Sequence, residues 1–246
     1  MINGTQASRH GLRVTHLFFA DDSLLFAKAN RRESERVKNV LQLYEECSGQ
    51  KINFDKSTLF FSSNTSDQTK FELKELFRVK ATMNLEKYLG LPTMVGKNKR
   101  YAFREIKSRI SIRLKSWNRK TLSIGGKELL VKIVVQAILT YVMGYFLLLK
   151  SLCNEINSMI CRYWWKHDRN MKRIHWKQMC MAKNAGGMIF RDMQLFNLAL
   201  LGKQWWRLQH NTKSLMYDVM KVRYFPSVSF LEAELESNPS LIWRSI

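Results

Sequence analysis

Residues 15–27 constrain the fold of this chain most strongly. Asp21 and Asp22 stand there between two apolar, aromatic-rich pieces, each about as long as one strand. Strand-forming residues on both sides of a short polar link predict a tight β-hairpin that carries the two carboxylates at its tip. Folding alone does not favour two adjacent like charges, whereas Mg²⁺ is commonly held by one or two carboxylates together with substrate phosphates. We therefore expect two-metal phosphoryl or nucleotidyl transfer at this tip.

The charge balance indicates a nucleic-acid partner. The chain has 41 lysines and arginines against 20 acidic residues, a net charge of +21 and a pI near 10. Such a balance is typical of proteins that bind a polyanion, although a generically basic protein is the alternative. At 246 residues and 46% hydrophobic content, the chain can bury a core in one or two domains.

The basic residues concentrate in residues 97–132, which contain twelve lysines and arginines and only two acidic residues, Glu105 and Glu128. Apolar residues recur there at helical spacing: Phe103, Ile106, Ile110, Leu114 and Trp117. This spacing predicts a helix with one face in the core. Because the cations have few acidic partners for i,i+4 pairing, a phosphate backbone beside this helix is favoured over a merely solvated face.

Residues 129–149 are mostly apolar and long enough to cross a membrane. Lys132, Gln136 and Thr140 recur every four residues, however, and so form a polar stripe on one side of a helix. This pattern favours a soluble helix that is buried on most sides, and we expect no membrane partner.

The cysteines do not form a disulfide framework. Cys47, Cys153, Cys161 and Cys180 are scattered, which is consistent with a reducing compartment, and the first residues lack the pattern of a secretory signal. A zinc site built from cysteines after residue 150 with His167 and His175 is an alternative. It lacks any Cys-x-x-Cys pair, so we favour buried small side chains for Cys161 and Cys180.

The overall pattern predicts an α+β chain. The expected elements are a helix over residues 30–48 that ends at Ser48-Gly49, extended segments at 52–54 and 57–61, a helix near 71–77, a strand at 87–92, and helices from 97 onward. The tryptophans of residues 150–246 could stack on bases, but their spacing more often indicates core. One core face is expected to comprise Phe196, Ala199, Leu200, Trp205 and Leu208.

Several motifs occur in the order found in one known family. Phe19-Ala20-Asp21-Asp22 resembles motif C of reverse transcriptases, in the form carried by plant non-LTR (LINE-type) retrotransposons. Ser-Gly-Gln-Lys-Ile-Asn at 48–53, with Lys56-Ser57, resembles motif D. Lys-Tyr-Leu-Gly-Leu-Pro at 87–92 resembles motif E, the primer grip. Later matches to the stretch before the family's zinc-binding segment include Tyr-Trp-Trp at 163–165, Ile-His-Trp at 174–176 and Phe-Asn at 196–197.

The resemblance implies a partial palm over residues 1–95, thumb-like basic helices over 96–150 and a helical, tryptophan-rich region over 151–246. It implies that Asp21 is a direct Mg²⁺ ligand, that Asp22 is more peripheral, and that Lys56 helps to protonate the leaving pyrophosphate. The residues near the primer would be Phe19, Ala20, Tyr88, Leu89 and Gly90. On the thumb, we expect the contacts with an RNA template and DNA primer to come from Arg104, Lys107, Arg113 and Lys115.

The chain also departs from the family pattern. None of the 20 residues before Asp21 is acidic, whereas the family takes a third carboxylate from a strand far upstream. We therefore expect an incomplete two-metal site in an internal piece of a longer protein, a piece that needs the upstream polymerase half for activity. The alternatives are a non-catalytic nucleic-acid-binding remnant and a pseudogene product. The family implies an intracellular, nuclear location, and an organellar one is the alternative.

Overall fold

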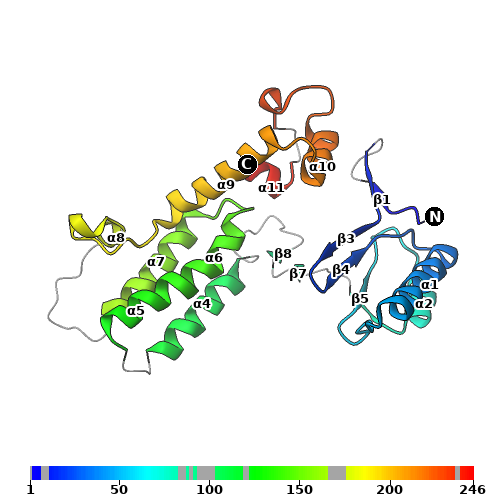
Figure 1. The fold of residues 1–246 in the computed structure, drawn as a ribbon, viewed down its shortest axis with the longest axis horizontal. Coiled ribbons are helices and arrows are strands. Elements are labelled where there is room, and N and C mark those ends of the chain that lie inside the picture. The colour runs from blue at the N-terminus through cyan, green and yellow to red at the C-terminus, as the bar shows by residue number, and fades with distance from the viewer. Residues whose placement is uncertain are drawn as a thin grey trace. The chain divides into compact units, whose positions relative to one another are not determined.

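The computed structural model describes residues 2–6, 11–82, 87–88, 91–92, 103–118, 122–165, 176–235 and 239–246. The chain divides into two compact units (Figure 1). Unit 1 comprises residues 1–94 and 213–234, and unit 2 comprises residues 95–212 and 235–246. The predicted α+β class is confirmed, since helices dominate and the strands form small two-stranded sheets.

The described strands of unit 1 form four pairs. The antiparallel pairs are β1 (Thr5–Gln6) with β2 (Arg13–Val14), β3 (His16–Phe19) with β4 (Asp22–Leu25), and β7 (Lys87–Tyr88) with β8 (Leu91–Pro92). The parallel pair is β5 (Thr58–Phe60) with β6 (Lys80–Thr82). Two predictions need correction. Lys87–Tyr88 and Leu91–Pro92 are two short paired strands where a single strand was predicted, and residues 52–54 lead into a turn instead of a strand.

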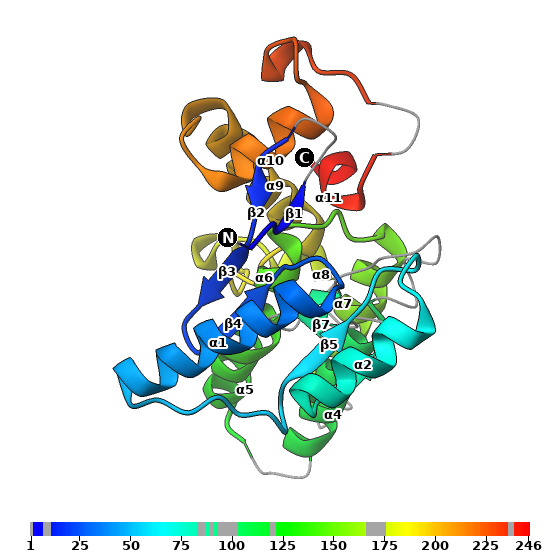
Figure 2. The ribbon, with the colours of Figure 1, turned by 90° about the vertical axis from the view of Figure 1, so that its right-hand side faces the viewer.

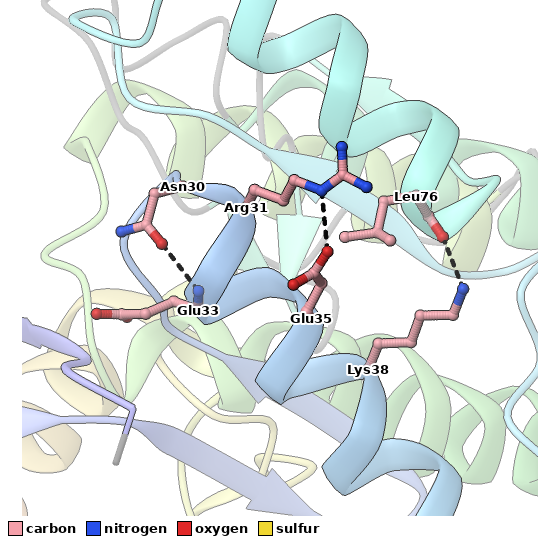
Figure 3. A network of polar contacts seen from close by, with 6 residues as sticks. All are labelled: Asn30, Arg31, Glu33, Glu35, Lys38 and Leu76. Carbon is pink, nitrogen blue, oxygen red and sulfur yellow. Dashed lines mark hydrogen bonds and ion pairs between the residues drawn. The ribbon is translucent and has the colours of Figure 1, made fainter.

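Helix α1 (Arg31–Ser48) follows the hairpin. It begins where the Asn30 side chain accepts a hydrogen bond from the Glu33 amide at 2.8 Å, and it ends at Gly49, which has a φ of 68° (Figure 3). Asn30 is thus a typical N-cap and Gly49 a typical left-handed C-cap. The sequence predicted the end of the helix at Ser48-Gly49. Helix α2 (Asp67–Phe77) is capped by Ser66.

Helices α1 and α2 pack against each other (Figure 2). Strand β6 contacts α2. The Lys38 ammonium donates to the Leu76 carbonyl at 3.2 Å, at the C-terminal end of α2 (Figure 3). A cation at this position complements the helix dipole. On α1, Val37 is buried, whereas Val40 and Tyr44 are exposed.

The later part of unit 1 contains α10 (Leu215–Tyr224) and a 3-10 turn at Phe230–Glu232. Phe225 is buried, and its ring contacts Tyr217 and Phe230 edge-on. Aromatic pairs of this geometry contribute beyond their buried area.

Unit 2 is helical where it is described. Its helices are α4 (Arg104–Trp117), α5 (Ile124–Leu130), a π-helical turn (Val131–Val135), α6 (Gln136–Met143), α7 (Lys150–Trp165), α8 (Trp176–Met179), α9 (Met193–His210) and α11 (Leu241–Ser245), with a 3-10 turn at Lys183–Ala185. Helices α4, α6, α7 and α9 pack on one another (Figure 1). The core face predicted for α4 is confirmed, because Phe103, Ile106, Ile110 and Leu114 are buried.

The prediction that residues 129–149 form a helix buried on most sides needs correction. Gln136 is only 3% exposed, and Lys132 and Thr140 are half-buried, so the polar stripe lies beside the core. The exposed side is apolar and includes Leu129 and Ile133, the latter 60% exposed. The reason is that this stretch is apolar on most sides, so its neighbours decide which apolar side is covered. No described helix combines the length and apolarity needed to cross a membrane.

The core face of α9 also differs from the prediction. Its buried residues are Met193, Asn197, Leu201, Gln204 and Leu208, whereas Ala199 is exposed. Of the predicted face, only Leu208 is fully buried, and Phe196, Leu200 and Trp205 are half-buried. Two polar residues occupy core positions here, and a pattern based on apolar residues alone passes over them.

Candidate functional site

The predicted hairpin is present, and it is as tight as a hairpin can be. Phe19 pairs with Asp22, so the loop consists of Ala20 and Asp21 alone. Ala20 has a φ of 51°, a region that costs an L-residue roughly 1–2 kcal/mol. The positive φ suits the first position of a hairpin turn, where glycine, asparagine or aspartate is usual. Backbone strain of this kind is often found at functional sites.

The strand register places the two aspartates differently. Asp22 begins β4 and shares a face with Phe19, Leu17 and Leu24, because side chains alternate across a strand. Leu17 and Leu24 are half-buried, while both aspartates are exposed. Asp21 lies in the turn itself. Consequently the carboxylates project from the end of the hairpin, and Asp22 continues its more buried face.

The hairpin tip carries two neighbouring carboxylates. Asp21 and Asp22 are oxygen ligands of the type that Mg²⁺ prefers. Within the described residues, however, no group of three or more His, Cys, Asp or Glu side chains could hold a metal ion. The described side chains therefore do not complete a two-metal site.

Glu33 holds the segments on both sides of the hairpin, a role that sequence reasoning missed. This residue is 4% exposed. Its carboxylate accepts hydrogen bonds from the Asn3 amide at 3.3 Å, the Asn3 side chain at 2.7 Å and the Lys28 amide at 3.0 Å. Burial acts to raise the pKa of Glu33, but the hydrogen bonds from Lys28 and Asn3 outweigh it and lower the pKa. The only sequence signal was a glutamate three residues after a capping asparagine.

Gly4 allows the chain to approach closely beside Asn3. Its φ is 48°, and a Cβ there would lie 2.5 Å from the Val14 carbonyl oxygen. Glycine is the residue that adopts this conformation without a steric cost. The pairing of β1 with β2 therefore depends on a residue without a side chain.

Lys56 lies in a tight turn and is exposed. The Asn53 side chain accepts a hydrogen bond from the Lys56 amide at 3.1 Å, and the Ser57 hydroxyl donates to the Asn53 carbonyl at 2.8 Å. Asparagine commonly stabilises turns in this way. Among the described residues, no hydrogen bond or ion pair joins Lys56 to either aspartate. Of the predicted primer-grip residues, Tyr88 lies in β7, and Leu89 and Gly90 fall outside the described residues.

The predicted cations of α4 do not form one patch. Arg104, Arg113 and Lys115 are exposed, whereas Lys107 forms an ion pair with Glu155 of α7. Arg104 and Lys115 are about three helical turns apart and so lie on one side of the helix. Arg113 lies on another side with Arg109, four residues earlier, which is also exposed and which the sequence prediction left out.

Cys153 is buried, and Cys161 and Cys180 are half-buried. Burial raises the pKa of the Cys153 and Cys161 thiols, and burial together with Asp192 and Cys161 raises the pKa of Cys180 to about 12. No metal-binding cluster occurs in the described part of the chain, and His167 and His175 lie outside it.

Comparison with known proteins gives two relatives in Arabidopsis thaliana, while no protein-family model matches. The "Uncharacterized mitochondrial protein AtMg00310" is 38% identical over 114 residues, which are 45% of this chain and 74% of that protein. The "Putative ribonuclease H protein At1g65750" is 30% identical over 137 residues, 54% of this chain. The chain spans only 22% of the second relative's length.

Proposed function

The chain belongs to the family of the Arabidopsis mitochondrial protein AtMg00310, and from this premise we propose that it derives from the reverse transcriptase of a plant LINE-type retroelement and binds nucleic acid. Both relatives are of a kind typical of plant retroelement-derived sequences. The resemblance implies a nuclear location. The mitochondrial name of the first relative supports the alternative, an organellar location.

The hairpin tip carries the proposal. A two-residue loop with adjacent aspartates, one of them continuing the more buried face, has little value for folding, because it combines like charges with a positive φ at Ala20. The same arrangement is useful where a cation and a polyphosphate meet. This observation supports descent from a polymerase palm.

The function that we assign to the chain by itself is binding of an RNA–DNA hybrid through α4. Three of its four predicted contact residues are exposed, and Arg109 adds a fourth exposed cation. Backbone recognition by such cations gives affinity without sequence specificity. Because no third carboxylate joins Asp21 and Asp22 in the described part of the chain, we propose that primer extension requires ligands from another polypeptide segment.

Binding can be tested with the purified chain and a labelled RNA–DNA hybrid over a range of salt concentrations. Two double variants are compared: Arg109→Ala with Arg113→Ala, and Arg104→Ala with Lys115→Ala. Each should weaken binding to the same extent for hybrids of unrelated nucleotide sequence. For each phosphate that a variant no longer neutralises, the salt slope should fall by about one. Lys70→Ala on α2, where the lysine pairs with Asp67, is a control that also removes positive charge. Binding that none of the α4 variants weakens would contradict the proposal.

Polymerase chemistry needs a separate assay. Magnesium-dependent primer extension should be absent for the chain alone, with Asp21→Asn as the control. Extension by the wild type that this control abolishes would overturn the proposed requirement for further ligands.

A further inference from the structure

Trp206 on α9 is unlike the other tryptophans. All seven lie in the described part of the chain, and six are buried or half-buried. Trp206 is 58% exposed. An indole that is more than half exposed contributes little to the core and keeps part of its ring available for other contacts.

The Trp206 ring is already stacked on one side. Its centroid lies 3.7 Å from that of His210, and the two rings are inclined by 21°. The imidazole is oriented in turn by a hydrogen bond in which Nδ1 donates to the Trp206 carbonyl at 3.0 Å. The pair therefore forms a rigid aromatic surface instead of two independent side chains.

The helix surface one turn before Trp206 is open. Side chains four residues apart lie above one another on a helix, and each leans toward the N-terminus. His210 occupies the turn after Trp206, so the free side of the indole faces the turn before it, where Gly202 stands. A Cβ at Gly202 would meet no atom within 4 Å. The helix surface at Gly202, one turn before Trp206, is therefore open.

The charges around this surface favour a polyanion. Lys203 and Arg207 are exposed, and the sequence of α9 contains no acidic residue. On the helix, Lys203 lies on the same flank as His210 and Arg207. Proteins that bind single-stranded nucleic acid combine an aromatic platform for the bases with nearby cations for the backbone.

We propose that Trp206, supported by His210 and open above Gly202, is a stacking site for an unpaired base of single-stranded nucleic acid. Lys203 and Arg207 contact the adjacent phosphates. This site goes beyond the hybrid binding assigned to α4, since it recognises bases that are not paired. Leu195 and Leu198 extend the exposed surface beyond Gly202 toward the N-terminus of α9. Alone they would suit an apolar protein partner, but they offer no contact for a phosphate.

The test compares two oligonucleotides of equal length with the full chain: one of deoxythymidines and one with abasic residues that retain the phosphates. Trp206→Ala should weaken binding of the first about five-fold or more and leave the second unchanged. Gly202→Leu should have the same selective effect because it fills the space beside the ring, while leucine favours the helix. Lys203→Ala with Arg207→Ala should weaken both oligonucleotides. Leu198→Ala, an exposed residue of the same helix, is the matched control.

The outcomes separate this inference from the proposed function. Equal binding of both oligonucleotides by the wild type would overturn the stacking site and favour a protein partner for this face. If Trp206→Ala and Gly202→Leu leave the preference for bases unchanged, the site is also overturned. Both variants should still bind the RNA–DNA hybrid as the wild type does, whereas the α4 variants should not. Failure of the wild type to bind any oligonucleotide or hybrid would contradict both proposals.

Discussion

The side chain of Asn197 accepts a hydrogen bond from the amide of Leu148 at 2.8 Å. Its nitrogen donates to the carbonyls of Met143 at 2.8 Å and Phe146 at 3.0 Å. Asn197 is 1% exposed, so these bonds are made in the core of unit 2. One residue of α9 therefore fixes the connection between α6 and α7, where the backbone groups have no helical partner.

Replacing Asn197 with leucine should strongly destabilise unit 2. The change would leave the Leu148 amide and two carbonyls buried without their partner, at about 1–3 kcal/mol for each such group. Denaturant unfolding should show that the free energy of unfolding falls by about 3 kcal/mol or more. Asn184→Leu, at an exposed position, is the control, and an equal effect of both changes would contradict this explanation.

The stability contributed by Glu33 should depend on pH. Its folded-state pKa lies below the ordinary value of 4.5, so the carboxylate stabilises the fold above about pH 4.5. This contribution is lost as the pH falls through the lower, folded-state pKa. At pH 7, Glu33→Gln should lower the free energy of unfolding by about 1.5–3 kcal/mol, the range for hydrogen bonds to a charged group. Thermal unfolding across pH should show the two proteins converging under acid conditions; a constant difference would show that the charge is not responsible.

Gly4→Ala should destabilise the start of the chain by about 1–3 kcal/mol, because alanine is strained at a φ of 48° and its Cβ would collide with the Val14 carbonyl. Gly125→Ala provides the matched comparison. Gly125 lies in α5, and a Cβ added there would have no atom within 4 Å, so alanine should stabilise the protein by about 0.5–1 kcal/mol. Chemical denaturation measures both changes, and effects of the same sign would refute the explanation.

Gln136→Met should stabilise unit 2. Gln136 is buried, and its Nε2 has no hydrogen-bond partner among the described residues. Methionine has a similar shape and removes the unsatisfied donor. We therefore expect the free energy of unfolding to rise by about 1–2 kcal/mol. Gln178→Met, at an exposed site of α8, should have little effect. A destabilised Gln136→Met variant in denaturant unfolding would indicate that the amide has a partner.

Local features were the ones that the sequence predicted best. The tip of the hairpin, the capped end of α1 and the buried face of α4 each follow from residues within a few positions of one another. Short-range propensity, capping and helical periodicity act over this distance. The expected face of α9 failed because Asn197 and Gln204 lie in the core, and no local rule indicates that a polar side chain will find its partners there.

The sequence by itself determined the two aspartates at the hairpin tip, the basic helix and the strongly positive charge. Only the tertiary structure decided that the polar stripe of residues 129–149 lies beside the core, that Glu33 is bound by Asn3, and that Trp206 is exposed. The physical reason is that burial depends on contacts between distant parts of the chain. Asn3 and Glu33 are 30 residues apart, and Asn197 and Leu148 are 49 apart. Such contacts arise from packing, which the pattern within any one segment does not contain.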